Sequence, residues 1–142
     1  MSQIPSVTIK PINWKETLPL RHKVLWPDKP VGFCLVDGDE SAWHLGAYLD
    51  ETMVGVASVF ALGEQARLRK FAVDPEHQNK GIGSQMLTFI INALRQQGTV
   101  STFWCDARES ASAVYQRVGM KKYGERFFKG DIPYFKMSMS IK

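Results

Sequence analysis

The 142-residue sequence has only two cysteines, Cys34 and Cys105, which lie far apart and form no C-x-x-C pair. A disulfide framework or a zinc site needs several closely spaced cysteines or histidines, so neither is expected. The three histidines, His22, His44 and His77, also lack the spacing of metal ligands. We therefore expect two reduced, partly buried cysteines and no metal site.

Long apolar runs are missing too, since none approaches the roughly 20 residues that a membrane-spanning helix needs. The first ten residues, MSQIPSVTIK, lack the basic flank, apolar core and cleavage site of a secretory signal. No repeat, low-complexity tract or linker divides the chain. These absences predict a single domain over residues 1–142 that is cytoplasmic and does not contact a membrane.

The charge balance is modest, with a formal net charge of +4. It suits ordinary solubility or a preference for anions. The sequence has neither an aromatic RNA-binding signature nor a helix-turn-helix pattern, so no nucleic-acid partner is expected. The cations are nevertheless concentrated around one short segment, where Arg67, Arg69, Lys70 and Lys80 occur.

Hydrophobic periodicity predicts a mixed α/β fold, in which strands come first and a βαβαββ order follows. Strands are expected at residues 7–10, 43–49, 53–60, 67–73, 100–105, 121–125 and 133–141, with 43–60 as an antiparallel hairpin. Helices are expected at 17–25, from 82 to the glycine at 98, and from 110 to 119. Thr17 is expected to cap the first helix and Ser110 the last. The proline-rich segment 27–32 is of the kind that often lies over a binding site.

The stretch QNKGIG, residues 78–83, stands between a predicted strand and a predicted apolar helix. Glycines there allow backbone N–H groups to approach an anion, and a helix N-terminus adds about half a positive charge. Lys80 precedes the first glycine instead of following the second, as a Walker loop requires. Met86 occupies the third glycine position of the dinucleotide-binding motif. The pattern favours a phosphate site of another kind, with a ligand-free tight turn as the alternative.

Two motifs together resemble the GCN5-related N-acetyltransferase (GNAT) family. Residues 69–83, RKFAVDPEHQNKGIG, are similar to its coenzyme A motif, an apolar strand ending V-x-P followed by [QR]-x-x-G-x-[GA]. Residues 111–120, ASAVYQRVGM, resemble its second motif, A-x-x-x-Y-x-x-x-G-[FM]. The resemblance covers residues 67–120 and is to small stand-alone bacterial members. It implies one central, mostly antiparallel sheet of six to seven strands flanked by about four helices.

The resemblance also implies an activity. It is that of an N-acetyltransferase, which moves an acetyl group from acetyl-coenzyme A to a primary amine of a small molecule or peptide by direct attack in a ternary complex. The alternative with the same fold is a catalytically weak acyl-coenzyme A sensor or interaction module. A homodimer is a further family-level expectation.

The resemblance assigns roles to particular residues. Tyr115 is implied as the acid that protonates the departing thiolate, although its place on an apolar helical stripe alone would suggest a core aromatic. The backbone of Phe71, Ala72 and Val73 is implied to splay from its neighbour and hold the cofactor. The pyrophosphate is implied to lie on the loop formed by Gln78, Asn79, Lys80, Gly81, Ile82, Gly83 and Ser84.

The general base is not identified by the resemblance. Many members carry a glutamate on the strand before the glycine loop, but residues 67–70 of this chain read RLRK. The candidates that remain are Asp37, Glu40, His44 and Glu64.

Two further departures involve arginines and a lysine. Arg108 stands where many members carry an asparagine near the cofactor. Arg67, Arg69 and Lys70 hint at an acceptor with a carboxylate or phosphate, or else serve the cofactor or the surface.

Overall fold

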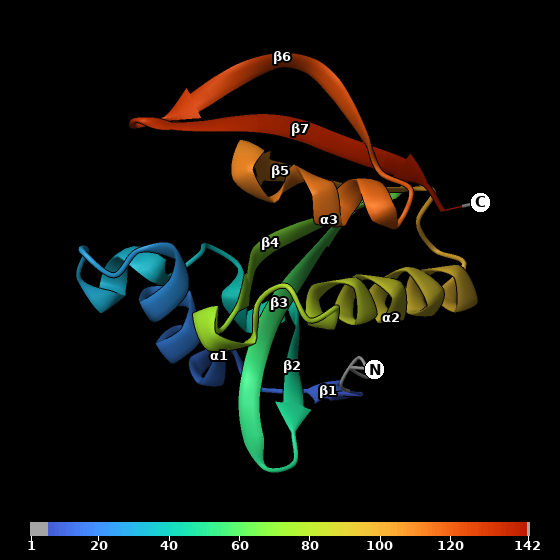
Figure 1. Ribbon diagram of the computed structural model, residues 1–142. Helices are drawn as coiled ribbons and strands as arrows, with labels where there is room; N and C mark the ends of the chain where they lie inside the picture. Colours follow the sequence, from blue (N-terminus) through green and yellow to red (C-terminus); the bar gives the residue numbers. More distant parts are fainter. Residues whose placement is uncertain (1–5, 142) are drawn as a thin grey trace.

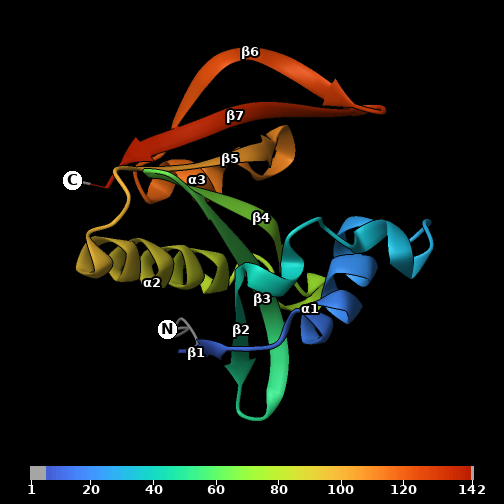
Figure 2. The same cartoon turned by 180° about the vertical axis from the view of Figure 1, so that it is seen from behind.

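The computed structural model describes residues 6–141, which form one seven-stranded sheet flanked by helices (Figures 1 and 2). The strand order is β1-β2-β3-β4-β5-β7-β6. Every neighbouring pair is antiparallel except β4 and β5, which are parallel. The predicted mixed α/β fold with a mostly antiparallel sheet is confirmed. Three α-helices occur in the described residues instead of about four, because the other helical segments are short 3₁₀ or π turns.

All predicted strands and helices are present; the strand at residues 43–49 has the predicted bounds and the bounds of the others differ. The strands are β1 (Thr8–Pro11), β2 (Trp43–Leu49), β3 (Thr52–Leu62), β4 (Gln65–Val73), β5 (Thr102–Arg108), β6 (Lys121–Lys129) and β7 (Ile132–Ser140). The α-helices are α1 (Trp14–Leu20), α2 (Ile82–Gln97) and α3 (Ser112–Arg117). The short turns are the π turn η1 (Arg21–Leu25) and the 3₁₀ turns η2 (Val31–Cys34), η3 (Asp39–Ser41), η4 (Pro75–His77) and η5 (Glu109–Ala111).

The two predicted helix caps were wrong. The first helix starts earlier, at a capping box in which the Asn13 side chain accepts from the Lys15 N–H at 2.8 Å and the Glu16 side chain accepts from the Asn13 N–H at 3.3 Å. This box satisfies N–H groups that a helix start otherwise leaves unpaired, so Thr17 is an interior residue. The turn η5 precedes α3 and displaces its start beyond Ser110.

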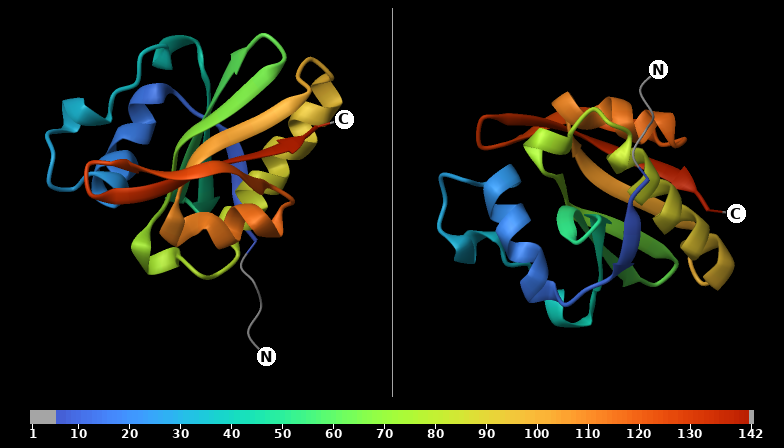
Figure 3. Two further views of the ribbon diagram at one scale, coloured as in Figure 1. Left: turned by 90° about the horizontal axis from the view of Figure 1, so that it is seen from above. Right: turned by 60° about the horizontal axis from the view of Figure 1, so that its bottom comes forward.

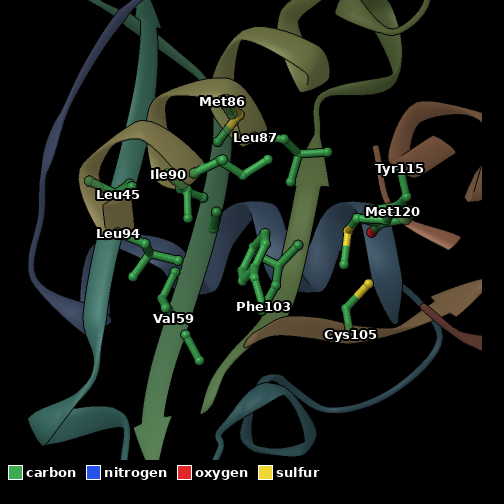
Figure 4. Packing of buried hydrophobic residues seen from close by; sticks show 14 of the residues in the cluster. Leu45, Val59, Met86, Leu87, Ile90, Leu94, Phe103, Cys105, Tyr115 and Met120 are labelled. Atoms are coloured by element: carbon green, nitrogen blue, oxygen red, sulfur yellow. The ribbon is translucent and has the colours of Figure 1, made fainter. Parts of the chain in front are cut away.

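The helices lie on opposite faces of the sheet, α2 and α3 on one and α1 with η1 on the other (Figure 3). Side chains of a strand alternate between faces, so β3 contributes Val59 to the main core and Val56 to a small cluster against α1. The main core is built on α2, whose buried residues Met86, Leu87, Ile90 and Leu94 face the sheet (Figure 4). Each such side chain contributes about 1.5–3 kcal/mol by burial.

The face against α1 is held mainly by a buried ion pair. The guanidinium of Arg21 is fully buried and donates to both carboxylate oxygens of Asp39 at 2.9 Å. It also donates to the Ser58 hydroxyl at 2.9 Å and to the Cys34 carbonyl at 3.1 Å. The imidazole of His44 completes the network, at 2.7 Å from the Ser58 hydroxyl and 2.6 Å from the Asp39 carbonyl. The network therefore fixes the segment from η2 to η3 on the sheet.

Both cysteines are free and buried. Within residues 6–141 no group of three or more histidine, cysteine or acidic side chains could hold a metal ion. The same part of the chain contains no helix long and apolar enough to cross a membrane.

The substitution Asp39→Asn tests the ion pair. Burial alone raises the pKa of Asp39, but the hydrogen bonds from Arg21 and from the Val36 N–H outweigh it and leave that pKa below its usual value. The substitution leaves Arg21 buried without its counter-charge, so we expect the free energy of unfolding at pH 7 to fall by about 3–5 kcal/mol in urea titrations.

The control is Asp37→Asn, an exposed site two residues earlier, where we expect a change within about 0.5 kcal/mol. Because the folded-state pKa of Asp39 is lowered, its stabilisation is present above the unfolded-state pKa and is lost as the pH falls through the folded-state value. The gap between the wild type and Asp39→Asn should therefore begin to shrink below about pH 4. A gap that stays constant down to acid unfolding would contradict the assignment.

Candidate functional site

A cleft opens where β4 and β5 stop pairing. The two strands are in register from Gln65 opposite Thr102 to Leu68 opposite Cys105, and no pair follows. Beyond this point the strand ends at residues 69–73 and 106–108 line a cleft of about 1010 Å³. An unpaired strand leaves backbone groups available to a ligand or to water.

A β-bulge bends β4 at the same place. In its pairing with β3, Ala72 lies opposite Val56 and Arg69 lies opposite Ser58, so one residue of β3 faces both Lys70 and Phe71. Lys70 takes the left-handed conformation, with φ 52°. A bulge of this kind increases the local bend and twist of a strand, which here accompanies the separation from β5.

The end of β4 offers a backbone donor to the cleft. The Asp74 N–H donates to the Val54 carbonyl at 2.8 Å, so it points toward β3. Successive N–H groups of a strand point in opposite directions, which turns the Val73 N–H toward the cleft. The Val73 carbonyl points the same way and accepts from the Gln78 side chain at 2.9 Å.

The glycine loop carries the chain from β4 to the start of α2. Asn79 and Gly81 have left-handed backbones, with φ values of 62° and 81°. A Cβ added to Gly83 would lie 3.2 Å from the Phe71 ring and 3.3 Å from a Val114 methyl group. The first turn of α2 therefore lies close to both β4 and α3, and its N-cap residue, Gly81, provides no side-chain hydrogen bond to the N–H groups of that turn.

Tyr115 lies on α3 with its ring buried and edge-on to Phe71, at a centroid distance of 5.9 Å. It lines the cleft close to Cys105 (Figure 4). Burial raises the pKa of the Tyr115 phenol well above its usual value. Burial also raises the pKa of the Cys105 thiol to about 12. At neutral pH both groups are protonated, so Tyr115 can act as a proton donor and Cys105 is a poor nucleophile.

Most of the predicted site residues lie together in this cleft. Those that line it are Phe71, Ala72, Val73, Gln78, Asn79, Gly81, Ile82, Gly83, Ser84 and Tyr115. Ala72 and Ile82 are buried core residues. Lys80 is exposed and is not part of the lining, so the structure does not bring it into the cleft.

None of the four candidate bases lines the cleft. Asp37, Glu40 and Glu64 are exposed elsewhere, and His44 is held in the Arg21 network.

The carboxylate that sequence reasoning missed is Asp106 on β5, the one acidic side chain of the described residues that lines the cleft. Its Oδ2 accepts from Arg67 at 2.9 Å and lies 3.4 Å from the Lys129 ammonium. Its Oδ1 is buried and has no hydrogen-bond partner in the described part of the chain. One acceptor position of this carboxylate is therefore unsatisfied at the wall of the cleft.

A hydrophobic wall on the far side of the cleft was also missed. It consists of Trp26, Phe33, Leu35 and Tyr134. Trp26 and Phe33 pack edge-on with a centroid distance of 5.0 Å. The proline-rich segment expected to lie over a binding site connects these two residues, and Lys29 within it lines the cleft.

Arg108 links this wall to the sheet. It donates to the Leu25 carbonyl at 2.8 Å and to the Tyr134 hydroxyl at 3.3 Å. Its guanidinium lies 5.2 Å from the centre of the Trp26 ring. The arginine that replaces the family's usual asparagine therefore ties the segment after α1 to β7.

Comparisons with known proteins agree with this geometry. A family model described as an acetyltransferase (GNAT) domain matches residues 34–141. The uncharacterised N-acetyltransferase YitI of Bacillus subtilis is 29% identical over 134 residues, which cover 88% of this chain and 87% of YitI. A ribosomal protein bS18 alanine N-acetyltransferase of Salmonella typhimurium is 33% identical, over 84% of this chain and 79% of that protein.

Solved structures show the same fold. The ribosomal-protein-S18-alanine N-acetyltransferase of Escherichia coli superposes with a TM-score of 0.79 at 20% identity, over 96% of this chain and 94% of that one. A GNAT family acetyltransferase of Elizabethkingia anophelis with acetyl-coenzyme A bound has a TM-score of 0.69 at 18% identity, over 94% and 97% of the two chains.

Proposed function

This chain belongs to the GNAT acetyltransferase family, and on that premise we propose that it transfers an acetyl group from acetyl-coenzyme A to a primary amine of a small molecule or peptide. The amine attacks directly in a ternary complex. The observation that carries the proposal is the cleft at the separation of β4 and β5, where a backbone donor, a protonated tyrosine and the start of a helix meet.

The residues around the start of α2 fit the pyrophosphate of coenzyme A. Gly83 lets the first turn of α2 pack closely against Phe71 and Val114 at the cleft, and that turn presents backbone N–H groups and positive potential. The loop from Gln78 to Ser84 would hold the pyrophosphate, and the backbone of Phe71, Ala72 and Val73 would contact the rest of the cofactor. The exposed Lys80 acts at most as a nearby positive charge. When bound, acetyl-coenzyme A supplies a thioester carbonyl and a thiol leaving group.

The Val73 N–H is the proposed donor to the acetyl carbonyl oxygen. It points into the cleft from a strand that β3 holds in place. A fixed backbone donor stabilises negative charge that develops on such an oxygen without having to reorganise.

Asp106 is the proposed proton acceptor. An alkyl amine with a pKa of about 10.4 is protonated at pH 7 and attacks only after it has lost one proton to the solvent. Once the new C–N bond forms, the nitrogen is positively charged and becomes a strong acid. The carboxylate of Asp106, which lines the cleft, takes the proton released as the bond forms. Arg67 and Lys129 hold the carboxylate in position through Oδ2.

Tyr115 is the proposed acid. Because the buried phenol is a weaker acid than a thiol with a pKa of about 8.5, it stabilises the departing thiolate mainly by donating a hydrogen bond to the sulfur in the transition state. Its buried position beside Phe71 keeps the Tyr115 ring in a fixed orientation.

The activity itself is tested by following thiol release from acetyl-coenzyme A over a panel of primary amines, with cofactor affinity measured separately by calorimetry. We expect both tight cofactor binding and amine-dependent thiol release. Cofactor binding without thiol release for any amine would overturn the transfer reaction and favour the acyl-coenzyme A sensor.

The substitution Tyr115→Phe removes the proposed acid and keeps the ring. We expect kcat to fall about 100-fold, within the range typical of general acid–base groups, while the Kd for coenzyme A stays within about twofold. Tyr123→Phe is the matched control, because Tyr123 is exposed on β6 and lies outside the cleft. Equal rates for the wild type and Tyr115→Phe would remove Tyr115 from the mechanism.

Asp106→Asn tests the proposed proton acceptor. The amide keeps the shape of the side chain but cannot take a proton, so we expect kcat/KM for the amine to fall about 100-fold with little change in coenzyme A affinity. Asp50→Asn, at the turn between β2 and β3, makes the same change far from the cleft. A normal kcat/KM for Asp106→Asn would show that the proton leaves by another route.

Gly81→Ala tests the glycine loop against a control with the same backbone strain. Gly81 and Gly98 both have left-handed backbones, with φ values of 81° and 68°, so alanine at either site should cost about 1–2 kcal/mol of stability. Gly98 ends α2 and lies outside the cleft. We expect only Gly81→Ala to weaken coenzyme A binding, by about tenfold, which corresponds to about 1.4 kcal/mol. Equal cofactor affinities in calorimetry would argue against the loop as the phosphate site.

A further inference from the structure

The charge of the cleft is strongly asymmetric. The single carboxylate of its described lining, Asp106, is surrounded by the cations Lys29, Arg67, Arg69, Lys70, Arg108, Arg117 and Lys129. Such an excess of positive charge in a concave site attracts anions and repels cations. Some of these cations interact with polar groups of the protein, and the others do not.

Four of these cations are accounted for. Arg67 and Lys129 hold Asp106, and Arg108 binds two oxygens of neighbouring elements. Arg117 also lines a shallow hollow beside Gly81, so it lies at the end of the cleft where the glycine loop begins α2. Three of these four cations therefore have partners within the protein, and Arg117 lies near the proposed site of the cofactor's pyrophosphate.

Arg69, Lys70 and Lys29 are different, because none of them forms an ion pair within 4 Å in the described part of the chain, and Arg69 has only longer-range attraction to Asp106 and Asp39. Each of them lies over an aromatic ring. Arg69 lies 5.9 Å from the centre of the Phe60 ring, Lys70 lies 5.9 Å from that of Trp26, and Lys29 lies 5.5 Å from that of Phe33. Burial, followed by the repulsion of neighbouring arginines, lowers the pKa values of Arg69 and Lys70. Two adjacent, partly desolvated cations would gain from an anion placed between them.

The bulge in β4 puts these two cations on one face of the sheet. The preceding Leu68 and the following Phe71 both belong with the main core on the side of α2. Arg69 and Lys70 lie between them and face the α1 side, where their rings Phe60 and Trp26 are. Consecutive residues of a regular strand would point to opposite faces. The extra residue of the bulge therefore places both cations at the cleft together.

The cofactor loop lies on the other face. Gly83 approaches Phe71 and Val114 on the side of α2 and α3, whereas Arg69 and Lys70 share the α1 side with Trp26. Asp106 also belongs to this second side, since its neighbours Cys105 and Ala107 on β5 face the main core. The unpaired cations thus lie with the proposed amine-binding carboxylate, away from the proposed phosphate site.

We propose that Arg69 and Lys70 bind an anionic group of the acceptor, so that the preferred substrate is a primary amine that also carries a carboxylate or phosphate. This inference rests on the proposed acetyltransferase function. The amine lies against Asp106, the anion lies between Arg69 and Lys70, and the rings of Trp26 and Phe33 contact an apolar part of the acceptor. Diamines and polyamines are poor substrates, because their second ammonium meets the cations.

The test compares related amines with and without an anionic group. L-phenylalanine is paired with phenylalanine amide, and phosphoethanolamine with ethanolamine, which distinguishes a carboxylate from a phosphate as the preferred anion. kcat/KM is measured for each member by thiol release in the wild type, Arg69→Gln, Lys70→Gln and the control Lys121→Gln. Lys121 is exposed on β6 outside the cleft and loses the same charge.

We expect the anionic member of at least one pair to be preferred in the wild type. The anionic-to-neutral ratio of kcat/KM should fall about 10- to 100-fold in Arg69→Gln or Lys70→Gln, the range of a charged hydrogen bond, and stay constant in Lys121→Gln. The two amines of a pair also differ in intrinsic pKa. This difference affects the wild type and the variants equally, so it cancels when their anionic-to-neutral ratios of kcat/KM are compared. Coenzyme A affinity should stay within about twofold in all three variants.

The outcomes separate this inference from the function on which it rests. Thiol release with an unchanged ratio in both cleft variants would overturn the anionic acceptor and leave the acetyltransferase standing. Cofactor binding without thiol release from any amine would overturn the proposed function and this inference with it. Should the variants fail to fold, the wild type alone decides, because a preference for neutral amines or polyamines over the anionic amines would overturn the inference.

Discussion

The separation of β4 from β5 is the constraint on which the rest of the site depends. A parallel pair satisfies the backbone groups on its facing edges, and here that pairing ends after Leu68 and Cys105. The groups beyond it must meet water or a ligand, because unpaired buried N–H and C=O groups are costly. The bulge at Lys70, the loop to α2 and the ring of Tyr115 all lie around this opening. A defect in the ladder is thus the origin of the cleft.

The two faces of the sheet are stabilised by different interactions. On the side of α2, an extended apolar core provides the free energy and holds the elements that frame the glycine loop. On the side of α1, among the residues that the structure describes, Leu20, Val56 and Ala72 form a small buried apolar cluster with partly buried neighbours. The ion pair of Arg21 with Asp39 holds the segment that carries the aromatic wall. Apolar burial is not directional and tolerates small shifts of the packed side chains, whereas a bidentate ion pair fixes the orientation of the segments that it joins.

Sequence reasoning predicted what is locally encoded. The periodicity of α2 and the motif positions of Gly81 and Tyr115 identified the helix, the turn and the aromatic that meet in the cleft. The bulge at Lys70 was not predictable, because a left-handed lysine reflects the pairing of two strands and not its own propensity. Asp106 was missed although it had a signal, as a lone acid in the otherwise apolar stretch FWCDA. Its role depends on strands that come together only in the fold.

The small cluster against α1 has a consequence for the evolution of the protein. Since few side chains hold that face, substitutions in the wall around Trp26 and Phe33 can accumulate without disturbing the core on which α2 rests. Proteins with this fold can therefore change the wall of the cleft while the core around α2 and the glycine loop stays the same. Arg21 and Asp39 are excluded from such substitutions, because the loss of either one leaves the other as an unpaired buried charge.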